Sequence, residues 1–218
     1  HYRKASHLLR HLAPDCLQSY HIRGRMVELP EEIIDEIDFY MYQTGHSAKE
    51  SDKEMCYQMP EYFLTNYPVK PLINSEPCYE SIGYAGNMYG RFHQFDIRRA
   101  AWQSLLAGAS AGITYGAGGV YSWHEYGKHF SPCIGEGFDM PHPWQIALHY
   151  PGAWDYSDIK HIFCEYKITD LNPRQDILLN ETKEIRIAEY QNRYFIYVPE
   201  NTTIKLKIDT NDIESIII

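Results

Sequence analysis

Acidic side chains follow a short apolar stretch in the segment KPLINSEPCYE, residues 70–80. Glu76 comes where the apolar stretch ends, Pro77 cannot continue a strand ladder, and Glu80 lies farther into the loop. Glycoside hydrolysis needs two carboxyl groups at the scissile bond: one donates a proton, and the other attacks the sugar or activates water. Because a strand end holds a glutamate firmly, we predict Glu76 in the second role and Glu80 as a supporting or substrate-binding residue. Without its neighbours, Glu76 would be interpreted first as a solvated loop carboxylate.

Polar and aromatic side chains also follow the other predicted strands. The candidate substrate-binding residues among them are His21, Gln43, His46, Tyr79, Tyr115 and Trp123. The carboxyl ends of parallel strands meet at one edge of a sheet, so we expect these groups to lie together. Amide and imidazole groups that bind hydroxyls, beside rings that stack on sugars, are typical of a carbohydrate pocket. The histidines could instead be hydrogen-bonded scaffold residues, and the rings could be part of the core.

Helical and extended patterns alternate over the first 166 residues. Helices are expected at 1–12, from Pro30, from Ser51, and at 96–108, 144–150 and 157–166, with an extended polar loop between the last two. Strands are expected at 16–22, 38–43 and 69–76, and a small-residue strand and loop at 111–123. Ser51 and Glu54 have the spacing of a capping box. Alternating strands and helices predict βαβ units with a parallel sheet, and therefore an α/β fold.

The pattern changes at about residue 167. Short alternating segments follow at 184–190, 193–199 and 202–209, after the linker ITDLNPRQD. These segments predict an antiparallel β module, of the sandwich type, with domains at 1–166 and 167–218. The last segment, IESIII, reads as an apolar strand with nothing after it, so we expect a truncated module.

Composition narrows the classes of partner. The formal net charge of −9 leaves no basic excess to bind a phosphate backbone, so we expect no nucleic-acid partner. No apolar run approaches the roughly 18 residues that a membrane helix needs, and the opening, which begins with His1, lacks the pattern of a signal peptide. Neither a metal triad nor a Gly-rich phosphate loop is present, so we expect no metal and no cofactor. The sequence leaves the cellular compartment open.

Five cysteines are spread widely through the chain, without a CxxC pair: Cys16, Cys56, Cys78, Cys133 and Cys164. An odd number at irregular spacing argues against both a disulfide framework and a zinc ribbon. We therefore expect reduced thiols that are mostly buried.

Three motifs in order resemble the apiosidase-like glycoside hydrolases: YQTGHS, KPLINSEPCYE and RRAAWQSLLAGASAGITYGAGGVYSW. That family has a (β/α)8 TIM barrel, usually followed by a C-terminal β-sandwich described as collagen-binding. The resemblance implies that the chain holds barrel strands five to eight and that Glu76, in the EPxYE motif, is a catalytic carboxylate. It also implies that Gln43, Gly45 and His46 line the pocket. The family's His-Pro-x-Gly turn is HIRG here, without the proline.

The resemblance further implies that the chain is a C-terminal fragment. In the family the partner carboxylate lies on the fourth strand, which has no counterpart here, so the fragment alone should not hydrolyse a substrate. We expect the intact enzyme to cleave O-glycosidic bonds of plant or microbial polysaccharides, or of their side chains, with retention and with Glu76 as nucleophile. Two alternatives stay open: a non-catalytic glycan- or matrix-binding protein, and a structural α/β protein without a pocket.

Overall fold

A three-stranded parallel sheet forms the centre of the molecule. The computed structural model describes residues 1–86, 88–130, 140–209 and 213–216. The strands β1 (Tyr40–Gln43), β2 (Leu72–Glu76) and β3 (Gly112–Ile113) lie in the order β1-β2-β3. Both pairs are parallel, as the alternation of helical and extended patterns predicts. The chain is thus a mixed α and β protein whose parallel strand ends share one edge.

The first predicted strand, at residues 16–22, is wrong: within it only His21 makes a β-bridge. His21 makes a parallel bridge to Met41 of β1, so this segment still lies along the edge of the sheet. Before that point a backbone bond, from the amide of Asp38 to the carbonyl of Gln18 at 2.9 Å, joins the two segments, and side chains add further bonds. The carboxylate of Asp38 accepts a hydrogen bond from the backbone amide of Gln18 at 2.7 Å, and the hydroxyl of Ser19 donates one to the carbonyl of Phe39. These side-chain bonds satisfy the backbone without a regular strand.

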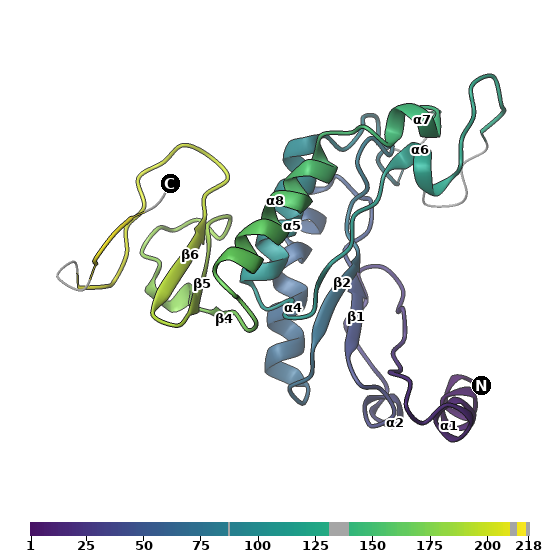
Figure 1. Cartoon of the computed structure of the whole chain (residues 1–218), viewed down its shortest axis with the longest axis horizontal. Helices are drawn as coiled ribbons and strands as arrows, with labels where there is room; N and C mark the ends of the chain where they lie inside the picture. The colour runs from purple at the N-terminus through teal and green to yellow at the C-terminus, as the bar shows by residue number, and fades with distance from the viewer. Residues whose placement is uncertain (87, 131–139, 210–212, 217–218) are drawn as a thin grey trace.

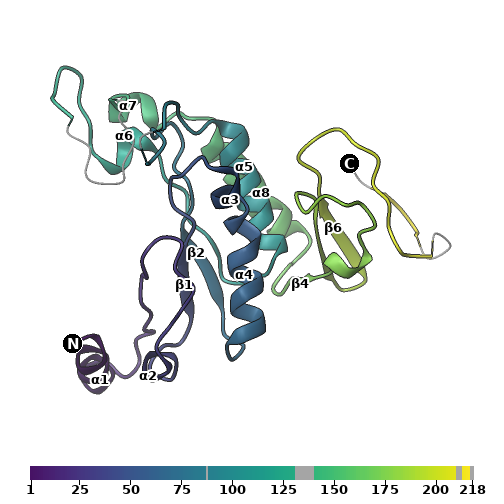
Figure 2. The same ribbon diagram turned by 180° about the vertical axis from the view of Figure 1, so that it is seen from behind.

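Three helices cover one face of the sheet: α4 (Met55–Asn66), α5 (Gln94–Leu106) and α8 (Gly152–Glu165). Figures 1 and 2 show them on the same side of β1 and β2. Burial alternates accordingly, since Tyr40 and Tyr42 of β1 are buried whereas Met41 between them is only partly buried. This period of two fixes which side chains face the helices and which face away.

Two helix ends differ from the predicted pattern. Ser51 lies inside a short helix, α3 (Glu50–Lys53), and Glu54 accepts a hydrogen bond from the side chain of Gln58, so the predicted capping box does not form. At the start of α5, by contrast, the carboxylate of Asp96 accepts a hydrogen bond from the backbone amide of His93 at 2.9 Å. Short-range patterns identified these helices but not the side chains at their ends.

The predicted extended loop between residues 150 and 157 is also wrong. Helix α7 (Trp144–Ala147) is followed almost at once by α8, which begins at Gly152. The reason is tertiary, because the carboxylate of Glu80 accepts the amide of Gly152 and completes the first turn of α8 from outside.

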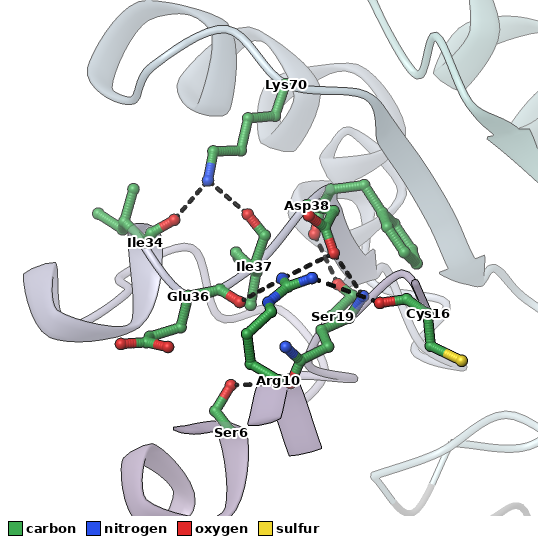
Figure 3. A network of polar contacts seen from close by, with 11 residues as sticks. Ser6, Arg10, Cys16, Ser19, Ile34, Glu36, Ile37, Asp38 and Lys70 are labelled. Carbon is green, nitrogen blue, oxygen red and sulfur yellow. Dashed lines mark hydrogen bonds and ion pairs between the residues drawn. The ribbon is translucent and has the colours of Figure 1, made fainter. Parts of the chain in front are cut away.

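A polar network ties the N-terminal helices α1 (Tyr2–Leu12) and α2 (Glu31–Ile34) to the sheet. Arg10 donates to the carbonyl of Glu36 and, at 2.9 Å, to the carboxylate of Asp38 (Figure 3). Lys70 donates to the carbonyl of Ile34, the last residue of α2, and to the carbonyl of Ile37, three residues later. These bonds fix the segments that enter β1 and β2. No helix of the described ranges is both long and apolar enough to cross a membrane.

The C-terminal segment forms a second, antiparallel sheet in the order β4-β5-β6. Its strands are β4 (Asn172–Pro173), β5 (Arg186–Tyr190) and β6 (Arg193–Tyr197), with the short helix η1 (Gln175–Ile177) after β4. The turn residues Gln191 and Asn192 both have positive φ, as a tight hairpin requires. Strands β5 and β6 and their antiparallel pairing agree with the sequence prediction.

The third predicted strand of this module, at 202–209, is wrong, since only Leu206 makes a bridge there. The side chain of Asn180 accepts a hydrogen bond from the amide of Lys205 and donates to the carbonyl of Thr203. These bonds add to two backbone bonds between the segments, from Leu179 to Lys205 and from Lys207 to Ile177. Residues 213–216 form no strand, and the end of the predicted strand at 217–218 lies outside the described residues.

The module packs on the helix layer rather than standing apart from it (Figure 1). The rings of Trp102 in α5 and Tyr197 in β6 are stacked, with planes 14° apart. Arg186 is 1% exposed, pairs with Glu61 of α4, and lies 4.7 Å from the centre of the Tyr57 ring. A buried arginine in such a contact makes a specific attachment.

Candidate functional site

Glu76 lies between two imidazole rings at the carboxyl end of β2. Its Oε1 is 3.4 Å from Nε2 of His46, and its Oε2 is 3.5 Å from Nε2 of His21. The side chain of Glu76 is 25% exposed, so one side of the carboxylate reaches solvent. The hydrogen bond from His46 is the main cause that lowers the pKa of Glu76; the charges of both rings act in the same direction, and desolvation opposes them. The carboxylate is therefore held in its ionised form, which is the form a nucleophile or a base needs.

The loop after β1 places His46 beside Glu76. The amide of Gly45 donates to the carbonyl of Glu76 at 3.2 Å, and Gly45 has φ +73°, a conformation that favours glycine. Nδ1 of His46 is buried and has no hydrogen-bond partner in the described part of the chain. Because Nε2 faces the carboxylate, this network assigns the ring proton of the neutral form to Nε2.

Gln43 is the register partner of Glu76 in the sheet, but its amide points toward the loop that carries His21. Its Nε2 donates to the carbonyl of Ile22 at 2.5 Å, and a Cβ on Gly24 would lie 3.2 Å from its Oε1. The amide of Arg25 also donates to the carbonyl of Gln43. The structure therefore places Gln43 where it shapes the HIRG turn; its predicted contact with a sugar hydroxyl stays a prediction.

The ring of Tyr79 lies next to His46, with centroids 4.6 Å apart, and next to Tyr121 at 5.7 Å. Burial raises the pKa of Tyr79, and the charge of Glu76 adds to the effect. Gly116 makes this position possible, because a Cβ there would lie 2.1 Å from Cδ1 of the ring. The sequence analysis did not single out Gly116, although it lies inside the third family motif.

Glu80 is 4% exposed and lies below the surface rather than in the open part of the site. Its Oε2 accepts the Tyr115 hydroxyl at 2.7 Å, and both of its oxygens accept the Gly152 amide, at 3.1 and 2.9 Å. A Cβ on Gly152 would lie 2.4 Å from Oε2. Burial, with the neighbouring Glu80, raises the pKa of Tyr115 far above its ordinary value. Glu80 thus joins the loops after β2 and β3 to α8, and Gly152 is a member of this cluster that the sequence analysis missed.

Trp123 is separate from that cluster and exposed. Its ring stacks on Trp144, with centroids 4.7 Å apart and planes 10° apart. The sequence analysis did not select Trp144, because nothing local connects it with Trp123. The contact between α6 (Gly118–Tyr121) and α7 brings the two segments together.

No group of three metal-ligating side chains occurs in residues 1–86, 88–130, 140–209 and 213–216. Cys56 and Cys78 are buried and free, whereas Cys16 and Cys164 are free but exposed. The expectation of mostly buried thiols is therefore wrong for half of these four, and Cys133 lies outside the described residues.

Comparisons with known proteins agree with the fold. Two solved structures each match 88% of this chain with a TM-score of 0.74: one described as a glycoside hydrolase, at 21% identity, and a glycoside hydrolase family 5 protein from Bacteroides vulgatus, at 22% identity. These matches show the fold. The chain covers 46% and 43% of their lengths, so it spans less than half of each. None of the curated proteins matches the sequence.

The family comparison covers most of the chain. Residues 1–170 match the family described as "Apiosidase-like, catalytic domain". The match takes in the His21, His46 and Glu76 cluster, the Glu80 cluster and the stacked tryptophans, and it ends just before β4. The chain therefore belongs to the apiosidase-like catalytic domain family.

Proposed function

We propose that Glu76 is a catalytic carboxylate of a glycoside hydrolase whose barrel this chain completes as strands five to eight. The observation that carries the proposal is the position of Glu76, ionised between His21 and His46 at the end of a central parallel strand. Ligand sites of parallel α/β proteins lie at this end of the sheet. Under the proposal, residues 1–166 belong to the barrel and residues 167–218 begin the accessory β module.

The role of Glu76 is nucleophile, and the reaction proceeds with retention. An ionised carboxylate attacks the anomeric carbon while an acid protonates the leaving oxygen; water then releases the sugar from the glycosyl ester. The partner acid comes from outside these 218 residues. Glu80 does not take that role, because its oxygens already accept bonds from Gly152 and Tyr115 and it is buried.

The surrounding residues bind and orient the sugar. His46 and His21 hold the carboxylate, Gln43 shapes the turn that carries His21, and Tyr79 closes the side of the site beside His46. The substrate is an O-glycoside of a plant or microbial polysaccharide. The site of this proposal requires neither a metal nor a cofactor.

The decisive test uses the full-length enzyme with Glu76→Gln and Glu76→Ala. Both variants should lose several orders of magnitude in kcat on a responsive aryl glycoside, while Glu76→Gln keeps its affinity for sugar. Azide should restore turnover to Glu76→Ala and give a glycosyl azide of inverted configuration, since one displacement replaces two. An azide product of retained configuration would make Glu76 the acid/base instead. Sugar binding by an enzyme that turns over no glycoside would favour the non-catalytic alternative.

A further inference from the structure

Two tryptophan rings lie stacked on the surface at the same end of the molecule as the candidate site. Trp123 follows α6 and Trp144 is the first residue of α7, and Figure 1 shows both helices beyond the end of the sheet to which β2 leads. The two rings are nearly parallel, 4.7 Å apart. The amide of Trp144 donates to the carbonyl of His124 at 2.8 Å, so the backbone as well as the rings holds the pair together.

The Trp123 ring is poorly buried for so large an apolar side chain. It is 62% exposed even though Trp144 stacks on one of its faces, so the opposite face is open. Its backbone has φ +49°, a left-handed conformation that is unusual for a bulky residue. Such a conformation is strained for a residue other than glycine, and residues of this kind collect at functional sites. Core packing does not explain this position, because the ring is not in a core.

A series of ring contacts leads from Glu76 to the helix that precedes Trp123. The imidazole of His46, which contacts Glu76, lies against Tyr79, and Tyr79 lies against Tyr121 at the end of α6. Trp123 follows two residues later on the same segment. The tryptophan pair therefore lies on the segment that continues from the last of these ring contacts.

We propose that Trp123, supported from behind by Trp144, binds a sugar unit that is remote from the bond cleaved at Glu76. The apolar C–H face of a pyranose or furanose ring would stack on the open indole face, since the face of an aromatic ring carries the negative part of its quadrupole. This second binding position rests on the proposed function and extends it: the substrate is an extended glycan rather than a single glycoside. Trp144 is a positioning residue that fixes the plane of Trp123.

The test measures binding in the full-length enzyme carrying Glu76→Gln, so that the ligand is not consumed. The probes are cello-, xylo-, arabino- and galacto-oligosaccharides of one to six units, titrated by calorimetry. Adding Trp123→Ala should weaken binding of the longer members of the responsive series by at least about tenfold, a factor that corresponds to 1.4 kcal/mol. Monosaccharide affinity should change by less than about threefold. Trp144→Phe should have little effect, and Trp144→Ala an intermediate one.

Tyr126→Ala is the matched control, because Tyr126 is an aromatic residue of the same segment that is 91% exposed. It should leave every affinity within about twofold of the parent. Equal affinities for Trp123→Ala and Tyr126→Ala would overturn the proposal, as would a parent enzyme that binds none of the oligosaccharides. If Glu76→Gln keeps full turnover while Trp123→Ala still weakens long glycans, the role of Glu76 is wrong but the second binding position stands.

Discussion

Nε2 of His46 lies 3.4 Å from Oε1 of Glu76, although His46 belongs to the loop after β1 and Glu76 is the last residue of β2. The bond from Gly45 to the carbonyl of Glu76 sets this distance, since it joins the loop after β1 to the last residue of β2. The acid–base properties of Glu76 therefore depend on a neighbour from another βα unit. Replacement of His46 should therefore change how activity depends on pH.

His46→Ala should move the acidic limb of the pH profile of kcat/KM to higher pH in the full-length enzyme. The hydrogen bond from His46 stabilises the ionised form of Glu76 and lowers its pKa, so removal of the bond raises that pKa. The variant should then lose activity earlier as the pH falls. His46→Gln keeps an N–H donor and should show a smaller shift. A shift to lower pH, or equal shifts for both variants, would contradict this explanation.

Gly116→Ala should disturb the site through Tyr79. The new Cβ would lie 2.1 Å from Cδ1 of the ring, so the ring must leave its place beside His46. We expect kcat/KM of the full-length enzyme to fall by at least about tenfold, the effect of losing roughly 1.4 kcal/mol of transition-state binding. In a double-mutant cycle, Gly116→Ala should add little to Tyr79→Ala, because the clash requires the ring. Additive losses would show that Gly116 acts independently of Tyr79.

Glu80→Ala should destabilise the fold more than Tyr115→Phe does. Loss of the carboxylate leaves both the Gly152 amide and the Tyr115 hydroxyl without an acceptor, at a cost of about 2–4 kcal/mol, whereas loss of the hydroxyl alone costs about 1 kcal/mol. Urea denaturation measures both free energies of unfolding. Gly152→Ala should also destabilise, but less in the Glu80→Ala background, where its Cβ no longer meets the carboxylate. Equal stabilities for Glu80→Ala and Tyr115→Phe would rule out the joining role of Glu80.

Glu61→Ala should loosen the attachment of the C-terminal module. It leaves the guanidinium of Arg186 buried without its carboxylate, which costs about 3 kcal/mol. Asp176→Ala is the control, because its ion pair with Arg174 is exposed and should contribute less than about 1 kcal/mol. Limited proteolysis within residues 168–176, the segment that enters the C-terminal sheet at β4, should accelerate only for Glu61→Ala. Equal proteolysis of the two variants would mean that the Arg186 contact does not hold the module.

Asp38→Asn should lower the free energy of unfolding at neutral pH. It should also make that free energy depend less on pH in the acidic range. The amide of Gln18 and the guanidinium of Arg10 lower the pKa of Asp38 in the folded state. Its contribution is therefore complete above the unfolded-state pKa of about 3.9 and is lost as the pH falls through the lower folded-state pKa. The stability difference between the wild type and the variant, measured by urea denaturation, should shrink toward low pH. A difference that is the same at pH 7 and pH 3 would assign the effect to a neutral hydrogen bond.

Local patterns in the sequence determined much of the framework. Alternation of apolar stretches with helical periods identified β1, β2, α4 and α5, and it indicated that the strands are parallel. The change of period after residue 167 identified the hairpin β5–β6. These features follow from backbone geometry and from which face is buried, and both of these are properties of neighbouring residues.

Only the tertiary structure decided which side chains meet. Glu76 and Glu80 lie four residues apart and are both acidic, yet one is partly open between two histidines and the other is buried against Gly152. Asp38 and Asn180 use side chains to satisfy backbone groups where the sequence predicts strands, because such bonds compete with a ladder at similar energy. The stacking of Trp144 on Trp123 depends on the contact between α6 and α7. Residue type and spacing along the chain do not encode these long-range contacts, since they depend on the packing of separate elements.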